Sequence, residues 1–244
     1  MKNRIQAFFN KISYHLKRGI HERFLFKISS KEAVFTGIYK SNYWENEESI
    51  SGLGSTLIQT DLLRSKFPEL LKTYSINSIF DSPCGDLNWM SLLIASNSFD
   101  YIGGDIVKEI VSNNTKKFGN SKTKFMHFDI TKDQFPNADM WLCRHVLFHL
   151  SNKDIYLALE NYANSNVKYI LTTNCKTASS HINQDIVTGN YRDLNLKLSP
   201  FNFPDKAIWE IDDYVDPAPP MTIALWRIED IRTILPEMKK NLGL

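Results

Sequence analysis

The sequence predicts an α/β fold, namely a Rossmann-like, doubly wound and mostly parallel sheet with helices on both faces. Two observations predict it. Short apolar segments alternate with longer amphipathic ones between about residues 56 and 173, and such alternation is typical of βαβ units. Acidic residues also end three successive predicted strands, which is where open parallel sheets bind their ligands.

The alternating region contains five expected strands, at residues 78–81, 101–105, 124–129, 139–143 and 167–173. Each is a short run of apolar or β-branched residues bounded by polar or glycine-containing stretches. Between them we expect helices at 56–73, 89–95, 106–118 and 152–161, with further helical material at Leu147. Because crossovers between parallel strands are right-handed, these helices should cover both faces of the sheet.

The alternation stops after Thr173. Residues 174–220 contain several Pro, Asn and Asp residues, so we expect an irregular insertion there after the fifth strand. A last strand at 222–226 and a last helix at 228–240 should complete the fold.

The composition is that of a globular protein, with 43% apolar and 23% charged residues. The sequence has no run of 18 apolar residues and no stretch resembling a secretory signal. The cysteines Cys84, Cys143 and Cys175 form no CxxC pair. A disulfide framework or a zinc knot is therefore not expected, and a reducing cytoplasm fits best.

Positive charge is concentrated at the start of the chain. Residues 1–31 hold eight Lys or Arg and one acid, a net charge of +7, whereas the remaining residues carry −5. Apolar side chains recur at steps of three and four within residues 4–28, which predicts one apolar helical face. We expect a basic amphipathic helical extension over residues 1–40 and a second domain over 41–244. The extension is either a cap that packs on the domain or an interfacial helix on anionic lipid.

Acidic residues end the first three predicted strands, at Asp81, Asp105 and Asp129. An acid that ends the second strand commonly binds ribose hydroxyls, and one after the third strand can accept a hydrogen bond from an amine such as that of adenine. Each acid could instead cap a helix. Three acids at successive strand ends favour a shared ligand site.

The segment Asp81-Ser-Pro-Cys-Gly85-Asp86 resembles the first motif of class I S-adenosylmethionine-dependent methyltransferases, with Pro-Cys-Gly in place of the usual Gly triplet. The resemblance covers roughly residues 40–175 and implies that S-adenosyl-L-methionine is the cofactor. The cofactor contacts that it implies are Asp81, Pro83, Cys84, Gly85, Asp86, Trp89, Asp105, Ile106, Asp129, Ile130 and Cys143.

Two further segments, residues 48–55 and 183–195, are similar to a bacterial subgroup of this family that is associated with surface polysaccharide (capsule or lipopolysaccharide) biosynthesis. This similarity implies methyl transfer to an oxygen of a small molecule or sugar, with or without a phosphate, that is a precursor of a surface glycan. The acceptor contacts that it implies are Ser51, Ser55, Asn183, Asp185 and Arg192. Related proteins usually have Arg-Asp where this chain has Arg144-His145, so either His145 replaces that Asp or the activity is altered.

The fourth predicted strand is followed by Arg144, His145 and His149, at the place where an acceptor would lie. Imidazole is well suited to proton transfer near neutral pH. We expect His149 to be the general base or an acceptor-binding residue, with His145 as the second candidate. Arg144 and Arg192 are candidates to clamp a phosphate or carboxylate. The two histidines lack the HExxH context of a zinc site, so no metal is expected.

Other functions are compatible with a Rossmann-like fold. A NAD-dependent oxidoreductase needs a glycine-rich turn that residues 81–88 lack, and a Rossmann-type binding protein would keep the fold without the reaction. Binding of nucleic acid is not expected, because residues 32–244 are acidic overall. The expected partners are a small-molecule or glycan-precursor acceptor in the cytoplasm and an anionic membrane surface contacted peripherally through residues 1–31. The sequence predicts no oligomeric state.

Overall fold

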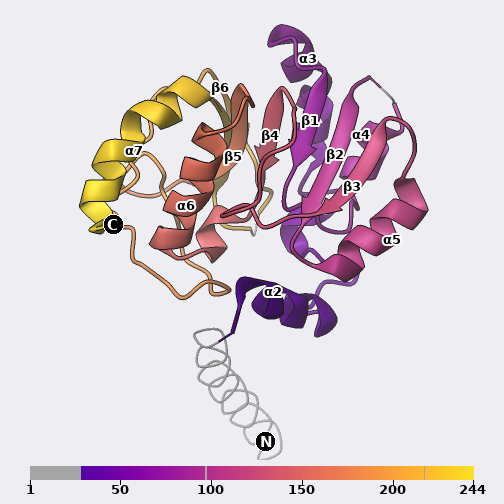
Figure 1. Ribbon diagram of the computed structural model, residues 1–244, viewed down its shortest axis with the longest axis horizontal. Helices are drawn as coiled ribbons and strands as arrows, with labels where there is room; N and C mark the ends of the chain where they lie inside the picture. Colours follow the sequence, from indigo (N-terminus) through magenta and orange to yellow (C-terminus); the bar gives the residue numbers. More distant parts are fainter. Residues whose placement is uncertain (1–28, 97, 217) are drawn as a thin grey trace, which may run out of the picture.

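A seven-stranded sheet forms the centre of the fold (Figure 1), in the order β3-β2-β1-β4-β5-β7-β6. The computed structural model describes residues 29–96, 98–216 and 218–244. The strands are β1 (Ser78–Asp81), β2 (Asp100–Asp105), β3 (Thr123–His127), β4 (Met140–Cys143), β5 (Tyr169–Cys175), β6 (Trp209–Asp212) and β7 (Met221–Arg227). Neighbours among the first five strands pair in parallel, and β7 is antiparallel to β5 and β6. The predicted fold class is confirmed.

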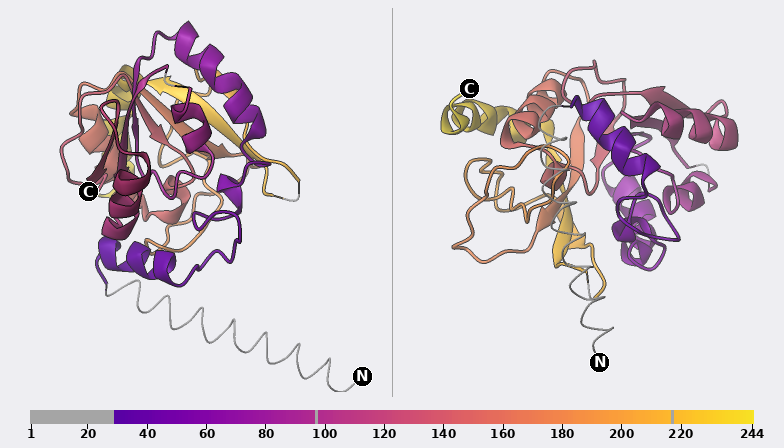
Figure 2. Two further views of the ribbon diagram at one scale, coloured as in Figure 1. Left: turned by 90° about the vertical axis from the view of Figure 1, so that its right-hand side faces the viewer. Right: turned by 90° about the horizontal axis from the view of Figure 1, so that it is seen from below.

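Helices cover both faces of this sheet (Figures 1 and 2). The longer helices are α2 (Lys31–Lys40), α3 (Asp61–Thr73), α4 (Met90–Ile94), α5 (Lys108–Phe118), α6 (Asn152–Ala163) and α7 (Ile228–Leu242). Two short 3₁₀ helices, η1 (Leu53–Ser55) and η2 (Leu147–His149), lie in the connections. The order of the strands reverses between β1 and β4, so the carboxyl ends of these strands form the switch point at which doubly wound sheets bind ligands.

Each face of the sheet has its own apolar core because successive side chains of a strand point to opposite faces. Phe80, Trp141 and Ile170 belong to the core that contains residues of α6 and α7. Their sequence neighbours Ile79, Leu142 and Leu171 belong to the other core, which contains residues of α3, α4 and α5. Burial on both faces explains why the central strands appear in the sequence as continuous apolar runs rather than alternating ones.

Two elements differ from the expectation. Strand β6 lies inside the region predicted to be wholly irregular, and its residues alternate between partly buried and exposed, so its apolar signal is weak. Helix α3 begins at Asp61 instead of near residue 56. The hydroxyls of Thr56 and Thr60 donate to the carbonyls of Leu53 and Thr56, and this local bonding keeps the preceding residues out of the helix.

Helix α2 lies across the edge of the sheet where the parallel strands end, as the view from below shows (Figure 2). Its Val34 and Ile38 are buried. Lys31 pairs with Asp154 of α6 at 3.0 Å, and Glu32 pairs with Lys108 of α5 at 2.8 Å, so α2 is joined to helices from both halves of the fold. The apolar face predicted within residues 4–28 lies outside the described residues.

None of the helices among the described residues is long and apolar enough to cross a bilayer. Within the same ranges, no group of three or more His, Cys, Asp and Glu is placed to hold a metal ion.

Replacement of Phe67 by Ala should destabilise the fold strongly. Phe67 of α3 is fully buried and its ring packs against Trp89 and Phe99. Loss of a buried aromatic ring typically lowers the free energy of unfolding by about 3–5 kcal/mol. Leu62 of the same helix is 45% exposed. Leu62→Ala should therefore change the free energy of unfolding by less than about 0.5–1 kcal/mol. Urea denaturation of both variants checks this, and equal losses would contradict the assigned burial.

Candidate active site

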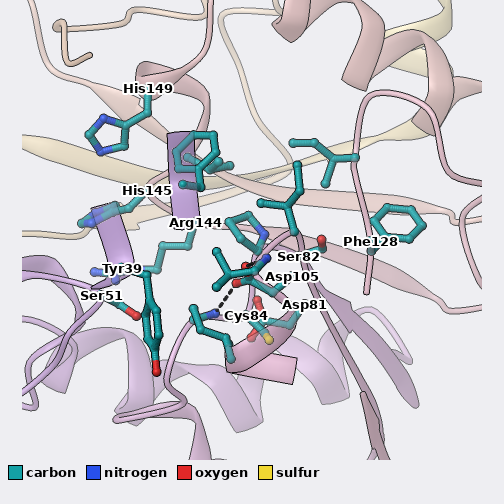
Figure 3. A pocket seen from close by; sticks show the side chains of 18 of the residues that line it. Tyr39, Ser51, Asp81, Ser82, Cys84, Asp105, Phe128, Arg144, His145 and His149 are labelled. Atoms are coloured by element: carbon teal, nitrogen blue, oxygen red, sulfur yellow. Dashed lines mark hydrogen bonds between the residues drawn. The ribbon is translucent and has the colours of Figure 1, made fainter. Parts of the chain in front are cut away.

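The carboxyl ends of β1, β2, β3 and β4 border a cavity (Figure 3). Its empty volume is about 1090 Å³, a value that includes its open mouth. Asp81, Asp105 and Asp129 all line it. The three acids therefore converge, as their positions at successive strand ends require.

The three carboxylates are buried and hydrogen-bonded. Asp81 accepts a bond of 2.6 Å from the hydroxyl of Tyr101, and burial raises the pKa of Asp81 to about 7. Burial also raises the pKa of Asp105 to about 6, although its carboxylate accepts bonds from the backbone N–H groups of Gly85 and Val107. Burial penalises the charged form of a carboxyl group. A cationic ligand in the cavity would offset this penalty and favour the ionised form of both carboxyl groups.

Asp105 and Asp129 also make local hydrogen bonds. Asp129 accepts bonds of 3.0 and 2.7 Å from the backbone N–H and the hydroxyl of Thr131, and Asp105 accepts the N–H of Val107 just before α5. Neither acid is a helix N-cap, because α5 has Val107 at that position without a side-chain cap bond and no helix of the described residues begins directly after Asp129. Both acids line the cavity.

The loop at residues 46–55 is fastened to the turn after β1. Asp86 accepts bonds from the hydroxyl of Ser49 at 2.9 and 3.0 Å, from the N–H of Ile50 at 2.9 Å and from the hydroxyl of Ser51 at 3.1 Å. Gly85 has a φ of +57°, and a Cβ there would lie 2.3 Å from the Ser51 oxygen. Asp86 was predicted to contact the cofactor. It lies outside the cavity lining, because its carboxylate instead holds the loop that brings Ser51 to the cavity.

Arg144 is also committed to the protein itself. Its Nε and Nη2 donate to the two carboxylate oxygens of Asp213 at 2.9 Å each, and its Nη1 donates to the carbonyl of Gly54 at 2.7 Å. Both side chains are buried. Although Arg144 lines the cavity, its guanidinium is not free to clamp a phosphate or carboxylate. Its role is to tie three segments together.

His145 follows β4 in a left-handed conformation, with φ of +56°. Its N–H donates to the hydroxyl of Thr173, and its Nε2 lies 3.4 Å from Asp213, longer than a good hydrogen bond. A Cβ on Gly54 would come within 2.2 Å of Nδ1, so that edge of the ring packs on the Gly54 backbone. Burial, and then the charge of Arg144, lower the pKa of His145. Both ring nitrogens therefore face protein groups.

His149 lies with its side chain at one end of the cavity, and Phe128 lies at the other (Figure 3). Its Nδ1 is 2.9 Å from the carbonyl oxygen of Asn190. A carbonyl can only accept, so Nδ1 carries the proton and Nε2 keeps its lone pair. Nε2 makes no hydrogen bond within the described residues. Burial lowers the pKa of His149 to about 4, so the imidazole is neutral at pH 7.

Most of the predicted site residues line this one cavity. Besides the three acids, Arg144 and the two histidines, they are Ser51, Ser55, Pro83, Cys84, Gly85, Trp89, Ile106 and Ile130.

Four predicted contacts, besides Asp86, do not line the cavity. Cys143 is fully buried in the apolar core. The Asn183 amide bonds to the carbonyls of Asn195, Leu198 and Ser199, and Asp185 accepts the N–H of Asn152 at the start of α6. The buried Arg192 has no hydrogen-bond partner among the described residues for its guanidinium. Residues 183–195, which were expected to bind the acceptor, instead lie behind η2 and support the cavity wall there.

Sequence reasoning missed the contribution of α2. Lys31, Phe35 and Tyr39 line the cavity, and their spacing of four places them on one helical face, so the pattern was available. It also missed Asp213, for which the sequence contains no signal, because its partner Arg144 is 69 residues away.

The same fold occurs in solved methyltransferases. Magnesium protoporphyrin IX methyltransferase from Synechocystis PCC 6803, solved with bound SAH, is similar with a TM-score of 0.56 and 11% identity over 83% of this chain and 96% of its own. The N-methyltransferase NodS from Bradyrhizobium japonicum WM9 has a TM-score of 0.50 and 10% identity, covering 69% of this chain and 96% of its own.

A methyltransferase domain of bacterial CtHen1 has a TM-score of 0.52 and 14% identity, over 69% of this chain and 99% of that domain. No protein-family model and no curated protein matches the sequence. At these identities the likeness establishes the fold, which is that of S-adenosylmethionine-dependent methyltransferases.

Replacement of Asp86 by Asn should loosen the 46–55 loop. The amide would place N–H groups where the carboxylate now accepts bonds, so we expect a loss of about 1–3 kcal/mol in the free energy of unfolding. Hydrogen exchange at the Ile50 amide should become faster. Asp100→Asn is the matched control, because Asp100 is exposed. Unchanged protection of the Ile50 amide would show that Asp86 does not hold the loop.

Proposed function

We propose that this chain transfers a methyl group from S-adenosylmethionine to an oxygen atom of a small molecule. The observation that carries the proposal is the convergence of Asp81, Asp105 and Asp129 on one cavity at the switch point of the sheet. The solved structures that share this fold include both an N-methyltransferase and a methyltransferase of a porphyrin. The fold alone therefore does not identify the acceptor, which must be argued from the residues of this cavity.

The residues present suit this cofactor. Buried carboxylates attract a cation and accept hydrogen bonds from hydroxyl and amine groups. The hydroxyl of Ser82, also buried at the cavity, has no partner among the described residues. In the proposed arrangement Asp105 holds the ribose hydroxyls, and Asp129 with Ile130 holds the adenine. Asp81 and the turn at Gly85 lie beside the amino acid part. When bound, the cofactor supplies a methyl group that its sulfonium charge already activates.

His149 is the residue best placed to receive the acceptor's proton. Its Nε2 keeps a lone pair, whereas both ring nitrogens of His145 face protein groups. With cofactor and acceptor bound, Nε2 of His149 would take the hydroxyl proton as the methyl group passes from the sulfonium sulfur to the acceptor oxygen. Proton transfer by a positioned base contributes roughly 10²–10⁴-fold to a rate. His145 lies against Asp213 and Gly54, and it positions the cavity wall beside His149.

The more specific substrate inferred from sequence resemblance, a precursor of a bacterial surface glycan, stays a prediction that the comparisons do not address. Oxidation with a nicotinamide cofactor is disfavoured, because the turn at residues 81–88 has a single glycine where pyrophosphate binding uses several.

Paired variants test the cofactor assignment. The unaltered chain should bind S-adenosylhomocysteine more tightly than NAD in isothermal titration calorimetry. Asp105→Asn should weaken this binding about ten- to hundredfold, since a hydrogen bond to a charged group contributes about 1.5–3 kcal/mol. His149→Ala, at the other end of the cavity, is the matched control and should leave it unchanged. Unaltered affinity in Asp105→Asn, or tighter binding of NAD, would refute the assignment.

For residues 1–31 we propose peripheral contact with an anionic membrane, on the basis of their net charge of +7. Each basic residue near an anionic surface contributes about 1 kcal/mol. The full chain should sediment with phosphatidylserine-containing vesicles and not with phosphatidylcholine vesicles. A variant with Gln in place of Lys11, Lys17, Arg18 and Lys27 should no longer sediment with these vesicles. A control variant with Gln in place of four lysines outside this segment (Lys66, Lys72, Lys116 and Lys117) should still do so. Equal loss in both variants would argue against a specific role of the segment.

A further inference from the structure

The two ends of the cavity differ in charge. Asp81 and Asp105 lie nearer to Phe128, whereas His145 and His149 lie toward the other end (Figure 3). Asp129 also lines the cavity and follows Phe128 in the sequence. We call this second end the acceptor end and define it by Trp44, His145 and His149, all of which line the cavity. The ring of Trp44 lies 5.6 Å from that of His149, centroid to centroid.

Charged groups at the acceptor end are already paired. Arg144 is bonded to Asp213 and Gly54, and Lys31 is bonded to Asp154 at 3.0 Å. Asp154 also accepts a bond of 2.5 Å from the hydroxyl of Thr188, so it is fixed in place. The charged side chains that line this end therefore all have a partner of opposite sign among the described residues; Arg192, whose guanidinium has no hydrogen-bond partner, does not line the cavity.

Neutral polar groups are also few there. The Ser51 hydroxyl donates to Asp86 and accepts the Asp86 N–H. His145 faces Asp213 and Gly54. The polar atoms that make no hydrogen bond to the described residues then include the Ser55 hydroxyl, Nε2 of His149 and the buried Nε2 of His145, which lies 3.4 Å from Asp213.

We infer that the acceptor is an uncharged aromatic ring bearing a hydroxyl group, that is, a phenol. This inference rests on the proposed function and specifies its substrate. A flat ring can pack against Trp44 in the offset or edge-to-face arrangements that aromatic rings prefer. Its hydroxyl can donate to Nε2 of His149. Methyl transfer to this acceptor would form the bond between the methyl carbon and the phenol oxygen, break the bond between that carbon and the sulfonium sulfur, and leave the phenol proton on Nε2 of His149.

Sugars and phosphate esters fit this end poorly. A sugar carries several hydroxyls, and each one buried without a partner loses its bonds to water. A phosphate brings about two negative charges, and buried charge is costly unless it is paired. Because Arg144 and Lys31 are neutralised by Asp213 and Asp154, neither is available without breaking an existing pair.

The inference is tested on the full chain saturated with S-adenosylhomocysteine. Saturation-transfer difference NMR compares phenol, phenyl phosphate and methyl glucoside at equal concentration. Phenol should bind most tightly. Trp44→Leu should weaken phenol binding about two- to tenfold, the range for loss of one aromatic pair, with the affinity for S-adenosylhomocysteine unchanged. Trp209→Leu, on the edge strand β6, is the matched control and should change neither.

Tighter binding of phenyl phosphate or methyl glucoside than of phenol would overturn the inference, as would no binding of phenol to the loaded protein. Equal phenol affinity in Trp44→Leu and the unaltered chain would overturn it too. These failures differ from failure of the proposed function, in which S-adenosylhomocysteine itself does not bind.

Discussion

The buried pair between Arg144 and Asp213 is the interaction on which the walls of the cavity depend. Removing two charges from water costs several kcal/mol per ion, and this cost is recovered only with good geometry and further hydrogen bonds. Here the pair is bidentate, and the third guanidinium bond goes to the Gly54 carbonyl. The pair thereby joins the end of β4, the loop before α3 and the connection between β6 and β7, which are distant in sequence. It also places Gly54 against His145.

The same pair divides the cavity chemically. With Arg144 paired to Asp213, the charged side chains that line the acceptor end have partners, while the carboxyl groups of Asp81, Asp105 and Asp129 line the other part of the cavity. In the reaction that we propose, the cationic cofactor would bind beside these carboxyl groups and the uncharged acceptor at the acceptor end. The two ligands would then be sorted by charge.

The fold was predictable from the sequence because its signals are local. Apolar runs such as 78–81 and 167–173 stand out within a few residues, and Asp81, Asp105 and Asp129 gather because parallel strands end at one edge. The edge strand β6 was not predicted, because it is half-exposed and its apolar pattern is weak. Hydrogen bonds between residues distant in sequence were not predicted either. Neither the bond from Arg144 to Asp213 nor the use of Asp86 as an anchor for Ser49 can be read from nearby sequence. Motif resemblance therefore assigned Asp86, Asn183 and Asp185 to ligands, although the structure uses them to hold backbone.

Helix α2 forms the roof of the cavity, and what holds it there has a consequence for its response to salt. Its two ion pairs, Lys31 with Asp154 and Glu32 with Lys108, are partly exposed, and such pairs contribute only about 0–1 kcal/mol each. Phe35 and Tyr39 of this helix pack against the apolar cores. Dissolved ions weaken the pairs but not the apolar contact. The ionic strength around the protein should therefore change how firmly this helix is held over the cavity.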